Sequence, residues 1–244
     1  MKELRYYEFE FFPSELNVSK SKSYYDLHDG KLYSDMRNKY ESKDYLQNKF
    51  FFPKNNEQYS ADQRIPDQEI QFYEFYLKEI SNEPDDFMCS IEINTSLGFF
   101  VSPKCKELLK RFELPSHRYY PVKISLEEDY EYYFLLIAKE ELHINYEQST
   151  FVERYNKTQE ISIKKFQDLL QLNPANEVGP AHYNVADIKE KIIVFDIAPD
   201  IYPVVTSTNG FFFFSERLKL ALEQEGMTGF KLYEAEKPQF FLAD

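Results

Sequence analysis

Histidine and cysteine, the side chains that most often act as acids, bases or nucleophiles, are scarce in this sequence. The 244 residues include four histidines and two cysteines. His143 and His182 are candidate general bases, and an acidic partner such as Asp187 could orient either imidazole in a hydrolase site. No nucleophile stands at a recognisable spacing from them, so surface or half-buried imidazoles are the favoured interpretation. A hydrolase of unknown substrate remains the enzymatic alternative.

Two further groups could bind a metal or act as a nucleophile. Asp26, His28 and Asp29 could surround one cation, but no HExxH motif or cysteine set accompanies them, which favours a polar turn. Cys105 follows a predicted helix start, where the pKa of a thiol falls, but it shares an apolar stripe with Leu108. We therefore predict a core cysteine and no metal-binding residue.

Glycine is scarce as well. The six glycines stand at positions 30, 98, 179, 210, 226 and 229, and no two have GxG or GxxxxGK spacing. A backbone needs such spacing to wrap around phosphates. The chain also has no GxSxG nucleophile elbow. The sequence excludes the common nucleotide-loop enzymes, and we predict neither a cofactor nor a catalytic residue.

The densest cluster of charge is acidic. The chain has 42 Asp and Glu residues against 29 Lys and Arg, a formal net charge of -13 at pH 7, which repels nucleic acid and attracts cationic partners. The cluster could supply two acids for hydrolysis, steer a basic protein, or form a solvated hairpin loop between residues 124 and 132. The predicted partner-binding residues are Glu127, Glu128, Asp129 and Glu131.

The cysteines and the hydropathy indicate the compartment. Cys89 and Cys105 are too few for a disulfide framework and form no CxxC pair, which favours a reducing environment. The N-terminal residues interleave charged and apolar side chains, unlike a secretory signal, and no window is apolar enough to span a membrane. We expect a cytoplasmic protein that binds neither membranes nor nucleic acid; the sequence leaves its oligomeric state open.

The elements that would position these residues include one unit that occurs twice. Residues 98–112 read GFFVSPKCKELLKRF, and residues 210–226 read GFFFFSERLKLALEQEG. In each copy a short strand precedes a serine, Ser102 or Ser215, whose hydroxyl can accept a hydrogen bond from an N–H group at the start of a helix. Replacing either serine with alanine should cost about 1 kcal/mol of stability.

The complete unit is strand, serine, helix and strand, over residues 98–124 and 210–233. Its two helices are expected to flank one sheet. Because the other strands and helices show no βαβ rhythm, we predict an α+β fold with a mixed, mainly antiparallel sheet. Residues 87–244 would form the main domain, and residues 1–86 a tyrosine-rich region that folds separately or completes the later sheet. An unpaired strand at residues 6–12 would allow partner binding by strand addition.

The region from Phe87 to Tyr233 resembles a known family, the large α+β immunity-protein family of bacterial polymorphic toxin systems, long described as a domain of unknown function. The pattern SxxLKxALExxGxTGF, which ends at Phe230, is moderately specific, and the order of the segments along the chain adds more to the resemblance than any one of them. The segments that carry it, in chain order, are FFVSPKCKELLKRFELPSHRYYPVKI, EYYFLLI, INYEQSTF and FFFFSERLKLALEQEGMTGFKL.

The resemblance implies a non-enzymatic antitoxin in the bacterial cytoplasm. Such a protein binds and neutralises a cognate toxin in the cell that makes it. The acidic charge of this chain favours a basic toxin. The resemblance carries no catalytic motif, so Ser102 and Ser215 are expected to be helix caps rather than nucleophiles. The alternatives are the hydrolase and a protein-interaction scaffold.

Overall fold

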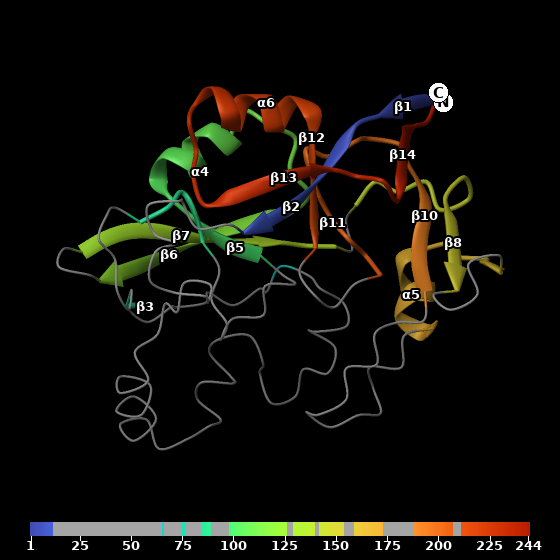
Figure 1. Ribbon diagram of the computed structural model, residues 1–244. Helices are drawn as coiled ribbons and strands as arrows, with labels where there is room; N and C mark the ends of the chain where they lie inside the picture. The colour runs from blue at the N-terminus through green and yellow to red at the C-terminus, as the bar shows by residue number, and fades with distance from the viewer. Residues whose placement is uncertain are drawn as a thin grey trace, which may run out of the picture.

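Strands dominate the computed structural model, as an α+β fold requires (Figure 1). The described residues are 1–11, 65, 75–76, 84–88, 98–125, 129–139, 142–153, 159–172, 188–206 and 211–244. Their strands form three sheets rather than the single sheet predicted. Most strand pairs are antiparallel, but β10 (Ile188–Phe195) runs parallel to β14 (Gln239–Leu242), and β3 (Phe75–Tyr76) runs parallel to β6 (His117–Ser125).

The first sheet has the order β3, β6, β7 (Asp129–Ile137), β5 (Gly98–Val101) and β4 (Phe87–Met88). The second has the order β11 (Ile201–Pro203), β12 (Phe212–Ser215), β2 (Tyr6–Phe11) and β13 (Phe230–Glu234). The third has the order β1 (Lys2–Leu4), β14, β10, β8 (Thr150–Glu153) and β9 (Glu160–Ile161). The described helices are α4 (Pro103–Leu109), α5 (Phe166–Leu172) and α6 (Glu216–Gln224).

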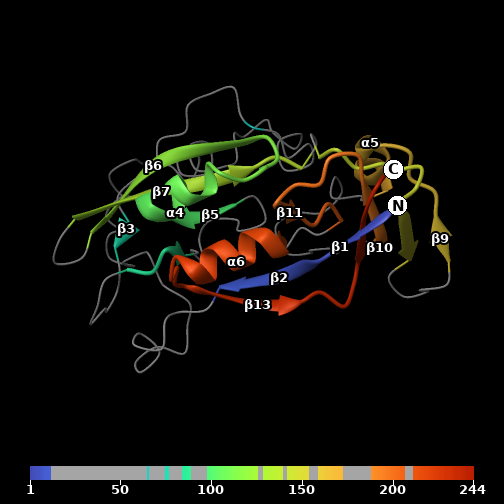
Figure 2. The ribbon, with the colours of Figure 1, turned by 90° about the horizontal axis from the view of Figure 1, so that it is seen from above.

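The duplicated unit is confirmed, but each copy has its own sheet. The first unit contains β4, β5, α4, β6 and β7, and the second contains β11, β12, α6, β13 and β2. Figures 1 and 2 show α4 and α6 side by side over these two sheets. The amine of Lys104 at the start of α4 donates to the carbonyl of Glu225 at the end of α6, at 2.7 Å. The two helices therefore run antiparallel.

The N-terminal strand β2 takes the position in the second unit that β7 takes in the first. Both strands lie between the strand before the helix and the strand after it. Val101 pairs with Tyr133, and Phe214, its equivalent, pairs with Tyr7. Because β2 pairs with β12 on one side and with β13 on the other, it offers no free edge for the predicted strand addition.

The two units share one hydrophobic core between their sheets and helices. Equivalent residues meet at its centre, because Phe99 and Phe212 form an edge-to-face pair with ring centroids 5.1 Å apart. Phe9 of β2 stacks on Phe214 at 4.5 Å. Aromatic pairs of this kind add stability beyond that of area burial. The N-terminal strand is thus part of the same core as the two helices.

The third sheet covers a second core. Phe195, Tyr202 and Phe240 pack there against one another, and Phe166 of α5 belongs to the same cluster. Ser162, the serine that precedes α5, lies four residues before its first residue, Phe166, and so is not its N-cap. The Asp168 carboxylate accepts from the backbone N–H groups that precede the helix, so the helix begins at Phe166.

Candidate functional site

The two serines of the duplicated unit cap their helices, as predicted. The Ser102 hydroxyl accepts from the N–H of Cys105 at 3.0 Å, and the Ser215 hydroxyl accepts from the N–H of Leu218 at 3.2 Å. Both serines have extended backbone angles, as N-cap residues do. Each hydroxyl therefore satisfies one N–H group that the helix cannot pair by itself.

Each capping hydroxyl also donates its proton to an aspartate. Ser102 donates to Asp86 Oδ1, and Ser215 donates to Asp200 Oδ1, both at 2.5 Å. The serine N–H donates to the carbonyl of the same aspartate at 2.9 Å in both units. Sequence reasoning missed these aspartates, although each follows closely on a proline and precedes an apolar residue in the sequence.

The second carboxylate oxygen of each aspartate binds the other unit. Asp86 Oδ2 accepts from the N–H of Thr228 after α6, at 3.1 Å. Asp200 Oδ2 accepts from the N–H of Glu113 after α4, at 2.7 Å. We call Asp86, Ser102 and Thr228 the first clamp, and Asp200, Ser215 and Glu113 the second clamp. The clamps fix the two units to each other reciprocally.

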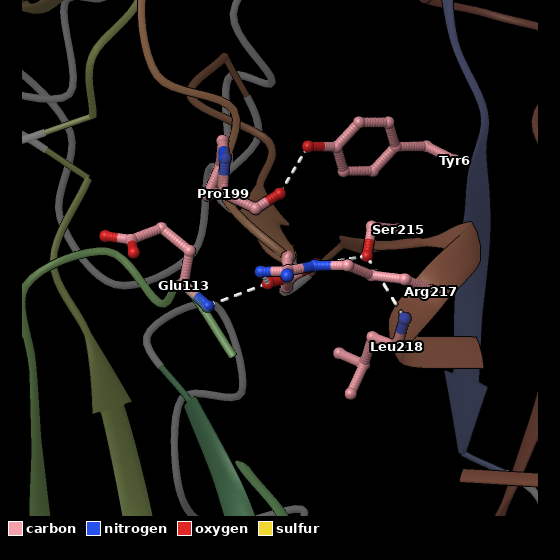
Figure 3. A network of polar contacts seen from close by, with 7 residues as sticks. Tyr6, Glu113, Pro199, Ser215, Arg217 and Leu218 are labelled. Atoms are coloured by element: carbon pink, nitrogen blue, oxygen red, sulfur yellow. Dashed lines mark hydrogen bonds and ion pairs between the residues drawn. The ribbon is translucent and has the colours of Figure 1, made fainter. Parts of the chain in front are cut away.

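Buried tyrosines bind the chain just before each aspartate. The hydroxyl of Tyr132 donates to the carbonyl of Asp85 at 2.9 Å, and the hydroxyl of Tyr6 donates to the carbonyl of Pro199 (Figure 3). Burial raises the pKa of both tyrosines, and the charge of a nearby aspartate raises it further. Both hydroxyls therefore stay protonated and serve as donors at neutral pH.

A lysine on each helix lies over the next tyrosine of the central strand. The ammonium of Lys106 is 3.5 Å from the centroid of Tyr133, and that of Lys219 is 5.0 Å from the centroid of Tyr7. A cation over an aromatic face is stabilising. Lys106 and Lys219 each stand four residues after the capping serine, and each makes the same kind of contact with its own sheet.

The two clamps differ in the cation that accompanies them. Arg217 donates through Nε to Asp200 Oδ1 at 2.6 Å and through its terminal nitrogen to Oδ2 (Figure 3). The equivalent Lys104 instead donates to the carbonyl of Glu225. Asp200 is only 3% exposed, so the arginine compensates a carboxylate that is shielded from water.

The two clamps also differ in the space beside them. At the first clamp, Gly229 has a φ of +91°, and a Cβ there would lie 2.1 Å from the carbonyl oxygen of Phe87. The backbone is therefore in close contact at this point. Beside the second clamp lies a cavity of about 540 Å³. Its walls include Glu113, Pro115, Ser116, Leu142, His143 and Ile197.

The predicted histidine sites are only partly within the described residues. His143 is exposed at the rim of this cavity. Within the described part of the chain, its ring makes no hydrogen bond to a carboxylate or a serine. His182 and Asp187, and also Asp26, His28 and Asp29, lie outside the described residues. Among the described residues, no histidine forms a hydrogen bond or ion pair with a carboxylate.

The predicted acidic cluster is divided by the start of a strand. Glu127 and Glu128 lie outside the described residues. Asp129 and Glu131 belong to β7 instead of the predicted loop, and they pair with Ser125 and Lys123 of β6. Glu131 is exposed, so it can contact a partner. The antiparallel hairpin carries these acids to the end of the first sheet that is remote from the third (Figure 1).

Cys105 is a core residue, as predicted. Its side chain is fully buried between α4 and the sheet. Burial raises the pKa of the thiol, and the charge of Asp86 raises it further. A buried neutral thiol is a poor nucleophile.

A buried pair of charged side chains was not predicted. Lys139, just after β7, and Glu190 of β10 are 1% and 8% exposed. Burial lowers the pKa of Lys139 to about 7, although the charge of Glu190 acts in the opposite direction. Burial also raises the pKa of Glu190, against hydrogen bonds from Thr206. Lys139 follows a strand of the first sheet and Glu190 lies in the third sheet, so no local sequence pattern predicts the pair.

No model of a protein family matches the chain, and no curated protein does either. Among the described residues, no group of three or more His, Cys, Asp or Glu side chains could hold a metal ion. No helix in the same part of the chain is long and apolar enough to cross a membrane.

Proposed function

We propose that this protein is a non-enzymatic immunity protein, which binds and neutralises a cognate polymorphic toxin in the bacterial cytoplasm. The observation that carries the proposal is the use of the serines and aspartates in the two clamps. Ser102, Ser215 and Asp200 stand in the region that resembles the family, and Asp86 stands directly before it. All four side chains are hydrogen-bonded within the two units.

The clamped arrangement of the two units suits a binding protein. Reciprocal clamps and a shared aromatic core hold two sheets and two helices in one arrangement. A rigid surface loses little conformational entropy when a partner binds, which favours tight association. The net charge of -13 would speed encounter with a basic toxin. Glu131 and its acidic neighbours are the proposed contact region.

Co-expression tests the proposal. The toxin-like reading frame next to this gene would be expressed with and without this protein, and growth and co-purification would be scored. Rescue of growth with a stoichiometric complex is expected. Loss of toxicity without a complex, or unchanged growth arrest, would count against an immunity protein.

A pair of charge reversals tests the contact region. Glu131→Lys on β7 should weaken the complex, whereas Glu234→Lys on β13 should not. Both glutamates are exposed strand residues, so the two changes are matched in chemistry and differ in place. Equal affinities of the two variants for the toxin would remove the hairpin from the interface.

A further inference from the structure

The cavity beside the second clamp is the main local departure from the similarity of the two units. In both units an aspartate binds the loop after the opposite helix. At the first clamp the loop packs closely against Phe87 through Gly229. At the second clamp the corresponding loop is one wall of an open cavity, with residues that join the first two sheets to the third as the other walls. The packing of the two units against each other does not by itself require a cavity at the second clamp.

The cavity has apolar walls and an acidic rim. Pro115 and Leu142 are buried in its walls, and Ile197, at 51% exposure, is one of the most exposed large apolar side chains among the described residues. The Glu113 carboxylate lies at the rim and points away from Arg217 (Figure 3).

The positive charge nearby is already compensated. Arg217 forms its ion pair with the buried carboxylate of Asp200, and the charge of Glu113 acts on it only as a weaker, longer-range contribution. An aliphatic stem fits walls of proline, leucine and isoleucine, and a cation fits a rim that carries the exposed Glu113 carboxylate.

We propose that this cavity receives a lysine or arginine side chain of the toxin as an anchor of the complex. The inference rests on the proposed function and names a second point of contact, apart from the hairpin. The stem of the anchor packs on Ile197, and its charged end pairs with Glu113. A long side chain in a preformed pocket is a common source of binding energy at interfaces.

Two matched pairs of variants of the full chain test the anchor, with the cognate toxin as the probe. Ile197→Asp is compared with Leu220→Asp, since Leu220 is a similarly exposed apolar residue, on α6. Glu113→Lys is compared with Glu107→Lys, an equal charge reversal on α4. Dissociation constants are measured by calorimetry at low and high salt, and melting temperatures verify folding.

We expect each cavity variant to weaken binding at least about tenfold and each control to change it less than about threefold. If Ile197→Asp lowers the melting temperature, Ile197→Ser replaces it. If the wild-type protein binds the toxin, and the cavity and control variants bind it with equal affinities, the anchor is wrong and the proposed function still stands. If the wild-type protein binds no toxin, both proposals fail.

Discussion

The buried ammonium of Lys139 should make the protein more stable as the pH rises above neutrality. Its pKa is about 7 in the folded state, against 10.5 for an exposed lysine. Between these values the unfolded chain binds a proton that the folded chain has lost. The free energy of unfolding therefore rises with pH in this window. The cost of burying the charged Lys139 grows as the pH falls from 10.5 toward 7.

The size of the effect follows from one proton. Each pH unit between the two pKa values changes the free energy of unfolding by about 1.4 kcal/mol. Over the two units from pH 7 to 9 the change would be twice this value, and partial titration of Lys139 near pH 7 reduces it to about 2 kcal/mol. Glu190 acts in the opposite direction, because burial raises its pKa above 4.5 and stability falls as the pH rises through the range between the two values. Burial raises the pKa of the buried tyrosines Tyr6 and Tyr132 well above 10, and tyrosines of the unfolded chain titrate only near pH 10, so pH 9 is a safe upper limit.

Urea unfolding at pH 7, 8 and 9 measures this dependence. Lys139→Met should remove the rise, because methionine does not titrate. Removing one partner of a buried pair also costs stability, so the pH dependence of the variant, and not its absolute stability, is compared with that of wild type. Lys189→Met, an exposed lysine next to Glu190 in β10, is the control and should retain the rise. An unchanged pH dependence in Lys139→Met would refute the assignment of the rise to this residue.

Two further predictions concern the clamps. Ser102→Ala should lower the free energy of unfolding by about 2 to 3 kcal/mol, because it removes both a cap and a donor to a carboxylate. Ser215→Ala should cost less, since the arginine of the second clamp still binds its aspartate; equal losses in urea unfolding would contradict this. Gly229→Ala should cost at least about 3 kcal/mol, because its Cβ would meet backbone at a positive φ, whereas Gly226→Ala, with no atom within 4 Å, should cost about 1 kcal/mol. Similar melting temperatures for the two glycine variants would refute the close approach.

The parts of the fold that depend on neighbouring residues were predictable. Ser102 and Ser215 were recognisable as caps because an N-cap acts on N–H groups only three residues away. Gly226, which follows α6, has a φ of +62°, the left-handed conformation in which glycine commonly ends a helix. The α+β class follows from the same local patterns of strands and short helices.

The parts that depend on distant residues were not. The place of β2 between β12 and β13 joins strands about 200 residues apart, and no periodicity in the sequence reports such pairing. The clamps likewise bind Asp86 to a residue 142 positions away. The repeated hydroxyls were visible in the sequence, but their acid partners were recognisable only once the two units were superimposed in space.

The two ends of the chain lie together, and their contact changes how the second unit is understood. The N-terminal ammonium of Met1 is 2.7 Å from a carboxylate oxygen of Asp244, and both labels meet at one corner of Figures 1 and 2. A chain closed there and opened after Phe11 would pass through β11, β12, α6, β13 and finally β2. This is the order in which the first unit passes through β4, β5, α4, β6 and β7, with β14 and β1 inserted. The two units are thus related by circular permutation.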